Sequence, residues 1–228
     1  DGRRAVVVDP GDARPIEAAL EQQGLALGAI LVTHHHPDHV GGVQALAARH
    51  GVEVYGPARE RMPCEVRPLD DGDIANLADL GLEFRVMAVP GHTLGHVAYH
   101  GHGALFCGDT LFSAGCGRLF EGTPAQMLGS LDRIAALPDD TQVYCAHEYT
   151  LANLRFAAAV EPGNADILET LEAVRELRAR DGITLPTTLG RERRINPFLR
   201  CREPAVRAAA EARAGTPLPG PADVFAVI

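Results

Sequence analysis

The sequence contains no lysine, because all 21 of its basic residues are arginine. Schiff-base catalysis, attachment of pyridoxal phosphate and a phosphate-binding loop of the Walker type are therefore excluded. The GxSxG pattern of serine hydrolases and the GxGxxG pattern of dinucleotide-binding folds are absent as well. The function must therefore depend on side chains other than lysine and on neither of these two motifs.

Cysteines are few and scattered. None of the five forms a CxxC pair, so neither a zinc ribbon nor a disulfide framework is indicated. No apolar run approaches the roughly 20 residues that span a bilayer, and Asp1-Gly2-Arg3-Arg4 leads into a strand-like run rather than the core of a secretory signal. We therefore expect reduced thiols, no membrane partner and a cytoplasmic protein.

The charge of the chain opposes a broad nucleic-acid surface. Its formal net charge is −9, whereas phosphate binding needs an excess of cations along one face. Hydrophobic residues make up 46% and charged residues 22%, as in ordinary globular proteins, and 228 residues allow one large or two modest domains. We expect a monomer with no nucleic-acid partner.

The densest group of chemically active residues follows the apolar run 29–32, which predicts a buried strand. Its sequence is Thr33-His34-His35-His36-Pro37-Asp38-His39. Alternate His34 and His36 can face one side of a loop, whereas Asp38 and His39, beyond the proline, can face a second point nearby. His35 is expected to be structural or to support a ligand rather than to be one. Imidazole and carboxylate ligands favour Zn, Fe or Mn over Ca or Mg. This loop therefore predicts a site for two metals.

Three later segments have the same form, an apolar strand that ends at a possible ligand. Residues 84–89 lead to His92, residues 104–107 lead to Asp109, and residues 142–146 lead to His147. Loops at the edge of a rigid sheet are a common place for functional side chains. Asp9 and Asp12 are either partners of a metal-bound imidazole or ordinary turn residues, while His96, His100 and His102 are assigned to hydrogen bonding or the surface.

The order of elements predicts an α/β sandwich followed by a helical region. Residues 6–8 read as a strand, residues 15–23 and 41–50 as helices ended by Gly24 and Gly51, and residues 64–146 mainly as strands. Thr123 begins a capping box, so residues 124–137 should be helical. Helical spacing of apolar residues at 151–160 and 165–180 predicts two further helices. We place the domains at residues 1–150 and 151–228.

These ligand positions resemble those of the metallo-β-lactamase superfamily. The segments 114–118 (Ala-Gly-Cys-Gly-Arg), 161–164 (Glu-Pro-Gly-Asn) and 196–200 (Asn-Pro-Phe-Leu-Arg) are similar to glyoxalase II, the hydroxyacylglutathione hydrolase family. The resemblance implies an αββα four-layer sandwich with catalytic function and a small helical C-terminal domain that binds substrate. Relative to that family, we expect the sequence to lack a first strand or two and two basic residues of the last helical segment that grip the glycine carboxylate of glutathione.

The resemblance also implies the roles of the ligands. His34, His36 and His92 would hold one divalent ion, Asp38, His39 and His147 the second, and Asp109 would bridge the two. Zn is the first choice, with Fe and Mn as alternatives, and Asp38 and Asp109 are the carboxylates assigned to catalysis. Two ions that share one water lower its pKa towards neutrality, which makes hydroxide available as the nucleophile.

The implied reaction is hydrolysis of the thioester S-D-lactoylglutathione to glutathione and D-lactate. A thiolate, whose parent thiol has a pKa of about 8.5, leaves without strong acid assistance. Arg118 stands where the family commonly has lysine and is expected to bind the peptide part of glutathione, as is Tyr149. Phe120 stands where the family often has tyrosine, so one hydroxyl contact is lost and the ring face is kept.

Three other functions compete with this hypothesis. A mononuclear iron persulfide dioxygenase acting on glutathione persulfide would leave Asp38, His39 and His147 without a joint role. A β-lactam hydrolase suits a cytoplasmic chain with a helical tail poorly. A non-catalytic metal-binding module would close each site with protein ligands and leave no open position.

Overall fold

Strand β2 (Ala26–Leu31) is buried on both of its faces. In the computed structural model, which describes residues 2–228, Ala29 and Leu31 join one hydrophobic cluster, whereas Ile30 and Val32 join another. Successive side chains of a strand point to opposite faces, so an uninterrupted apolar run places hydrophobic groups on both. The strand is therefore central to a covered parallel sheet.

The chain divides into two units. The first comprises the residues up to Ala88 together with Leu94–Gly108, and it contains a parallel and an antiparallel sheet. The parallel strands, in sheet order, are β1 (Arg4–Val8), β2, β3 (Val54–Pro57) and β4 (Arg67–Leu69). The antiparallel strands are β5 (Ile74–Leu77), β6 (Leu82–Ala88), β7 (Val97–Gly101) and β8 (Ala104–Phe106), with the 3₁₀ turn η1 (Ala78–Leu80) between β5 and β6.

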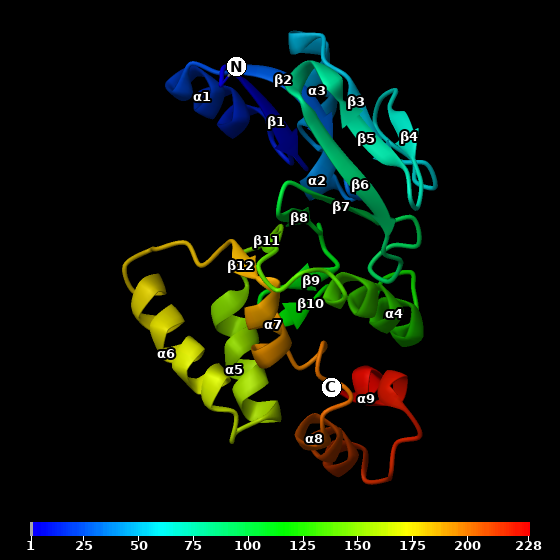
Figure 1. Cartoon of the computed structure of the whole chain (residues 1–228), viewed down its shortest axis with the longest axis vertical. Coiled ribbons are helices and arrows are strands. Elements are labelled where there is room, and N and C mark those ends of the chain that lie inside the picture. The colour runs from blue at the N-terminus through cyan, green and yellow to red at the C-terminus, as the bar shows by residue number, and fades with distance from the viewer. Residues whose placement is uncertain (1) are drawn as a thin grey trace. The chain divides into compact units, whose positions relative to one another are not determined.

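The two faces of the parallel sheet have different partners. On one face, Ile30 packs with Leu20 of helix α1 (Ala13–Gln23) and Leu46 of helix α3 (Val43–His50). On the other, Leu31 packs with side chains of the antiparallel sheet, including Tyr99. The first unit is thus layered as helices, sheet and sheet, and its elements occupy the blue to green part of the chain in Figure 1.

Two glycines end helices α1 and α3 where the sequence predicts. Gly24 and Gly51 adopt left-handed backbone angles, with φ of 63° and 64°, and each donates its N–H to a carbonyl of the preceding helix. The predicted start of the second helix at residue 41 was wrong, because the short helix α2 (Pro37–Val40) precedes α3. A Cβ on Gly42 would lie 2.7 Å from the Pro10 carbonyl oxygen, so glycine is needed for this close approach.

The second unit, Val89–Thr93 with Asp109–Ile228, is mainly helical. Its helices are α4 (Pro124–Ala135), α5 (Thr150–Val160), α6 (Ala165–Arg178), α7 (Leu189–Ile195), α8 (Pro204–Ala214) and α9 (Pro221–Val227). Its short strands are β9 (Leu111–Phe112) paired with β10 (Gly115–Cys116), and β11 (Gln142–Tyr144) paired with β12 (Thr187–Thr188). The capping box at Thr123 is confirmed, and α5 and α6 lie side by side in Figure 1.

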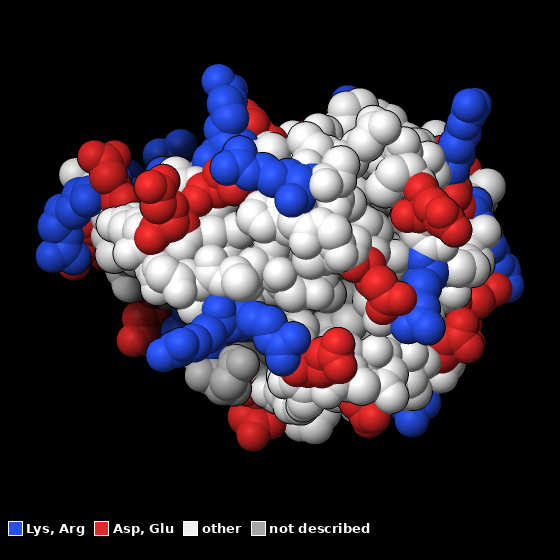
Figure 2. Space-filling view, turned by 90° about the horizontal axis from the view of Figure 1, so that it is seen from above, with Lys and Arg blue, Asp and Glu red and all other residues white. Residues whose placement is uncertain are grey.

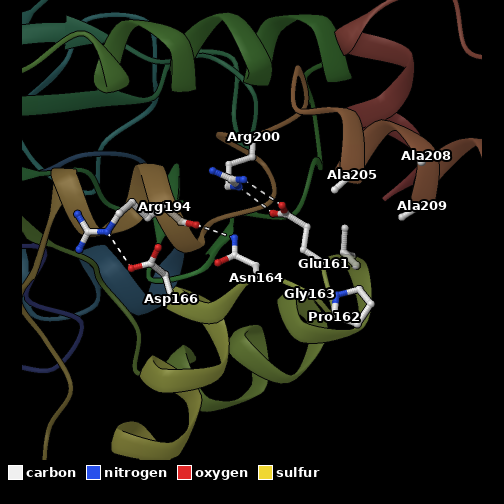
Figure 3. A pocket seen from close by; sticks show the side chains of 11 residues that line it. Glu161, Pro162, Gly163, Asn164, Asp166, Arg194, Arg200, Ala205, Ala208 and Ala209 are labelled. Atoms are coloured by element: carbon white, nitrogen blue, oxygen red, sulfur yellow. Dashed lines mark hydrogen bonds and ion pairs between the residues drawn. The ribbon is translucent and has the colours of Figure 1, made fainter.

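The segments 161–164 and 196–200 meet in this second unit. The Glu161 side chain is 3% exposed and accepts two hydrogen bonds from the Arg200 guanidinium, at 2.7 and 2.9 Å. Asn164 caps α6, and its side-chain amide donates to the carbonyl of Arg194. The guanidinium of Arg194 pairs with the Asp166 carboxylate. These residues border a cavity of about 780 Å³ in which the charged groups face one another (Figure 3). The two segments therefore join neighbouring helices.

A second buried carboxylate, that of Glu192 on α7, is fully enclosed. One of its oxygens accepts hydrogen bonds from the hydroxyls of Ser113 and Thr187, both at 2.8 Å. The other accepts the N–H of Ala114 at 2.7 Å and the side-chain amide of Asn196 at 3.3 Å. Burial raises the pKa of Glu192, although these hydrogen bonds oppose the shift.

Glu192→Gln is expected to stabilise the protein at neutral pH relative to the wild type. Because the pKa of Glu192 is higher in the folded state than the 4.5 of an ordinary glutamate, the folded state binds more protons above pH 4.5, and stability falls as pH rises through the folded-state pKa. The amide is neutral throughout, and its oxygen can accept from Ala114 and Asn196 while its NH₂ donates to the two hydroxyls.

Thermal unfolding of both proteins in chelator, followed by circular dichroism from pH 4.5 to 8, measures this difference. About 1 kcal/mol moves the midpoint of a chain of this size by about 2–4 °C. The advantage of the variant should grow with pH. A midpoint difference that stays constant or shrinks over this range would contradict the prediction.

Candidate metal centre

The loop that follows β2 is fixed near its start, at Thr33. The Thr33 N–H and hydroxyl both donate to the Asp9 carboxylate, at 2.7 and 2.6 Å, and the Val97 N–H donates to the Thr33 carbonyl at 3.0 Å. The loop then runs to Pro37, which occupies the first turn of α2, where its missing N–H costs nothing. The position of the histidines is therefore set by strands β1, β2 and β7.

His34 and His36 direct ring nitrogens towards each other. His34 is fully buried, and its Nδ1 lies 3.0 Å from the Thr33 hydroxyl. Its Nε2 lies 3.1 Å from Nδ1 of His36. The predicted pairing of these alternate residues on one side of the loop is confirmed by this distance. His35 points elsewhere, because its Nδ1 lies 2.9 Å from the Glu60 carboxylate, as expected for a structural histidine.

The Asp9 carboxylate also orients His39. Its Oδ2 lies 2.9 Å from Nδ1 of His39, whose side chain is 2% exposed. This contact directs Nε2 of His39 away from Asp9 and towards Asp38, whose nearer oxygen is 3.7 Å away. Asp12, by contrast, caps helix α1 through the Arg14 N–H. Of the two roles left open for these aspartates, Asp9 therefore has the imidazole contact and Asp12 the turn contact.

His96 is a buried neighbour of this loop that sequence reasoning missed. It is fully buried, and its ring stacks on that of His34 with centroids 4.6 Å apart. Gly108, with φ of 48°, lies close to both Thr33 and His96. A Cβ on Gly108 would be 2.3 Å from the Thr33 hydroxyl and 2.7 Å from Nε2 of His96. The spacing of His96 after His92 gave no signal, because its stacking on His34 depends on a contact between distant segments, in which the Val97 N–H donates to the Thr33 carbonyl.

In the second unit, two histidines flank Asp109. Nε2 of His92 lies 3.5 Å from Oδ2 of Asp109, and Nε2 of His147 lies 3.4 Å from Oδ1. Nδ1 of His92 lies 2.7 Å from the Arg118 carbonyl, which turns Nε2 towards the carboxylate. A Cβ on Gly117 would lie 1.7 Å from the Asp109 carbonyl oxygen, so glycine alone permits this close turn. Each carboxylate oxygen of Asp109 thus faces a different imidazole.

The spacing of these donor atoms fits divalent metal ions. Ligand atoms about 2.0–2.2 Å from one tetrahedral ion are about 3.3–3.6 Å apart, and somewhat closer when more ligands are bound. The two nitrogen–oxygen distances at Asp109 fall within or close to this range, and the His34–His36 distance lies just below it. Nitrogen and carboxylate oxygen donors together suit Zn, Fe and Mn. The donor sets of both units are therefore suited to such ions.

Exposed aromatic rings adjoin both histidines of the second unit. The ring of Tyr149, a residue that is 50% exposed, stacks on His147 with centroids 5.1 Å apart. The ring of Phe120, a residue that is 61% exposed, contacts His92 edge to face at 5.2 Å, and the Arg118 guanidinium lies 5.9 Å from the Phe120 centroid. Of the three residues predicted to bind substrate, Tyr149 and Phe120 therefore lie next to predicted metal ligands, and Arg118 lies beside Phe120.

The surface gives no sign of a phosphate-binding stripe on the face shown in Figure 2, where arginines alternate with acidic side chains around an uncharged area. Within residues 2–228, helices long and apolar enough to cross a membrane are absent.

Two family models together match the whole chain. One, for the metallo-beta-lactamase superfamily, matches residues 1–147, and the other, described as the hydroxyacylglutathione hydrolase C-terminus, matches residues 148–228. These matches confirm the expected α/β domain followed by a helical C-terminal domain.

Curated relatives are similar over almost the entire sequence. The chain is 58% identical over 228 residues to a hydroxyacylglutathione hydrolase from Cupriavidus taiwanensis, covering 95% of this chain and 86% of that protein. It is 57% identical over 225 residues to the hydroxyacylglutathione hydrolase of Pseudomonas fluorescens, covering 98% and 88%.

Solved structures show the same fold. ETHE1 from Myxococcus xanthus matches with a TM-score of 0.64 at 26% identity, covering 99% of this chain and 86% of that one. TTHA1623, solved in a di-iron-bound form, matches with a TM-score of 0.59 at 30% identity, covering 84% and 87%.

Asp9→Ala is expected to weaken metal binding by about 10- to 100-fold, because it removes the group that orients His39. Asp12→Ala is the matched control in the same turn. It should lower stability slightly through loss of the helix cap and leave metal affinity unchanged. Competition with a chromophoric chelator measures both. Equal metal affinities in the two variants would show that Asp9 has no part in holding the ligand.

Proposed function

This chain belongs to the hydroxyacylglutathione hydrolase family of the metallo-β-lactamase superfamily, and from that membership we propose that it hydrolyses S-D-lactoylglutathione to glutathione and D-lactate. The observation that carries the proposal is the position of Asp109, with one carboxylate oxygen towards His92 and the other towards His147. A carboxylate placed in this way is suited to bridge two cations. The chain is accordingly an enzyme, a thioester hydrolase.

We assign the metal ligands to both units of the chain. His34, His36 and His92 would hold one ion, and Asp38, His39 and His147 the other, with Asp109 shared. The convergence of His34 and His36 supports the first set, and the approach of Asp38 to Nε2 of His39 supports the second. Two ions per chain, Zn in first place and Fe or Mn as alternatives, agree with these donors.

When bound, the ions would supply Lewis-acid activation of a water and of the thioester carbonyl. The side chains of this protein hold and orient the reacting groups. Asp38 and Asp109 would provide negative charge to offset the repulsion between two cations held close together. Arg118 offers a fork of N–H donors to the carboxylate or amide oxygens of the glutathione peptide, and the Tyr149 hydroxyl offers another donor. The glutathione thiolate leaves without a proton donor, since it is a weak base.

The mononuclear dioxygenase is not favoured. It leaves three ligand candidates without a role, and proteins 50–58% identical to this chain are named hydroxyacylglutathione hydrolases. We further propose residues 1–150 as the catalytic domain and residues 151–228 as the substrate-binding domain. Cytoplasmic location and a monomeric state stay predictions; gel filtration coupled to light scattering tests the latter.

His147→Ala is expected to lower thioester hydrolysis by about 100-fold or more, because loss of a partner that merely orients a metal ligand already costs about 10- to 100-fold and His147 is itself a proposed ligand. Metal content should fall from about two ions per chain towards one. Plasma emission spectrometry and the absorbance of the thioester bond measure the two effects. His50→Ala, which removes an imidazole that pairs with Glu17 near the end of α3, is the control and should retain both ions and full activity. Unchanged hydrolysis in His147→Ala would refute the two-ion assignment.

Phe120→Tyr is expected to lower KM for glutathione thioesters by about two- to tenfold with little change in kcat, because an exposed hydroxyl adds one hydrogen bond to the bound peptide. The ring lies beside Arg118 and is accessible. Steady-state kinetics on S-D-lactoylglutathione measure the change. A lactoyl thioester of a short thiol without the peptide is the control substrate, and its KM should not move. An equal effect on both substrates would place the new hydroxyl away from the peptide.

A further inference from the structure

The tip of the β9–β10 hairpin is held by helices. Its strands are only two residues long, and two residue pairs form the ladder, Phe112 with Gly115 and Leu111 with Cys116. Ala114 at the tip is fully buried and has φ of 55°, a left-handed conformation that is unfavourable for a residue with a Cβ. So short a hairpin cannot keep this shape by itself.

Three side chains, on α5, on α7 and at the C-cap of α7, hold the main chain at this tip. Asn196 donates to the carbonyls of Phe112 and Gly115, at 3.1 and 2.9 Å, and Asn153 donates to the carbonyl of Ser113 at 3.0 Å. Glu192 accepts the Ala114 N–H and the Ser113 hydroxyl. Glu192 also accepts from Asn196, so it links the tip to the residue that grips both strands.

The same hairpin is linked to the groups that flank Asp109. Asp109 precedes it, and the Gly117 N–H closes its base by donating to the Thr110 carbonyl at 3.2 Å. Phe112 contacts the rings of His147 and Tyr149, with centroids 5.8 and 5.3 Å away. Beyond the hairpin, the Arg118 carbonyl fixes Nδ1 of His92. Displacement of the tip would therefore move both neighbours of the Asp109 carboxylate.

We propose that Glu192 is a positioning residue for the metal centre, which acts by holding the β9–β10 hairpin so that Asp109 faces His92 and His147. The inference rests on the proposed two-ion hydrolase and adds to it a residue of the helical region, far along the chain from every ligand. Glu192 touches no reacting atom. Its effect passes through four hydrogen bonds to the main chain and side chains named above.

Glu161 provides a comparison within the same unit. It is also a buried carboxylate, but its partner is Arg200, and the cavity beside it is bordered by the ends of α5 and α6 and by α8 (Figure 3). Its two carboxylate oxygens accept from the Arg200 guanidinium, which lies outside the hairpin. Truncation of either side chain to alanine should reduce stability, since it leaves buried donors without their acceptor, but only truncation of Glu192 should alter the metal centre.

The test uses the full chain loaded with Co²⁺, whose visible absorption reports on the ligands. Glu192→Ala should change this spectrum and weaken metal binding by about 10- to 100-fold in chelator competition. Glu192→Gln should restore the wild-type spectrum, because it retains the acceptor for Ala114 and Asn196. Glu161→Gln should lower the melting temperature and leave spectrum and affinity as in the wild type. A wild-type spectrum and affinity in folded Glu192→Ala would overturn the inference.

A milder variant keeps the test decisive if Glu192→Ala does not fold. Asn153→Ala removes one hydrogen bond to the Ser113 carbonyl and should weaken metal binding by about two- to tenfold, the effect of a single hydrogen bond. Unaltered affinity in Asn153→Ala, together with an unaltered spectrum, would show that the hairpin tip does not control the centre.

The outcomes for the two proposals are distinct. Wild-type protein that binds two Co²⁺ ions but leaves S-D-lactoylglutathione intact would refute the proposed activity, and the spectral comparison of Glu192 variants would still decide the positioning role. Wild-type protein that hydrolyses the thioester, with Glu192→Ala unaltered in spectrum and affinity, would refute the positioning role alone.

Discussion

The arrangement of the predicted ligands depends on one kind of interaction, a largely enclosed carboxylate whose oxygens accept hydrogen bonds from a neighbouring loop. Asp9 meets this description in the first unit, through Thr33 and His39, and Glu192 meets it in the second, through Ser113 and Ala114. Loops have few apolar contacts to define them, whereas a carboxylate in a low-dielectric interior interacts strongly with each donor and is costly to leave unpaired. The loop of His34, His36 and His39 and the hairpin that follows Asp109 are therefore fixed by polar contacts to scaffold elements.

Much of the fold follows from local patterns in the sequence. Gly24 and Gly51 ended helices as predicted, and Thr123 began one, because these signals depend on a few adjacent residues. The break between α2 and α3 was not predicted, since it arises from contact of Gly41 and Gly42 with residues 10–12, about 30 positions earlier. Patterns of nearby residues do not encode such contacts between distant segments.

The same distinction applies to the candidate site. His34, His36 and His39 were recognisable because a dense run of imidazoles is rare as a purely structural feature, and the sequence alone located them. His96 and Glu192 were not, because a lone histidine after a glycine and a glutamate among arginines have no distinctive pattern. Their importance depends on tertiary neighbours, the ring of His34 in one case and the tip of a hairpin in the other.

A carboxylate at position 192 has a cost in stability, since burial disfavours its charged form. Its advantage over an amide is that it permits only one conformation of the hairpin tip. Both oxygens of the ionised carboxylate only accept hydrogen bonds. The N–H groups of Ala114 and Asn196 and the hydroxyls of Ser113 and Thr187 can therefore all donate to it in a single arrangement. An amide has a donating and an accepting end, and reversal of its side chain would set N–H groups against Ala114 and Asn196. Buried polar groups can favour one geometry over competing ones at the expense of stability. A hairpin with two-residue strands and a left-handed alanine has few other means of selecting its conformation, so an all-acceptor side chain at its tip is a reasonable source of that selection.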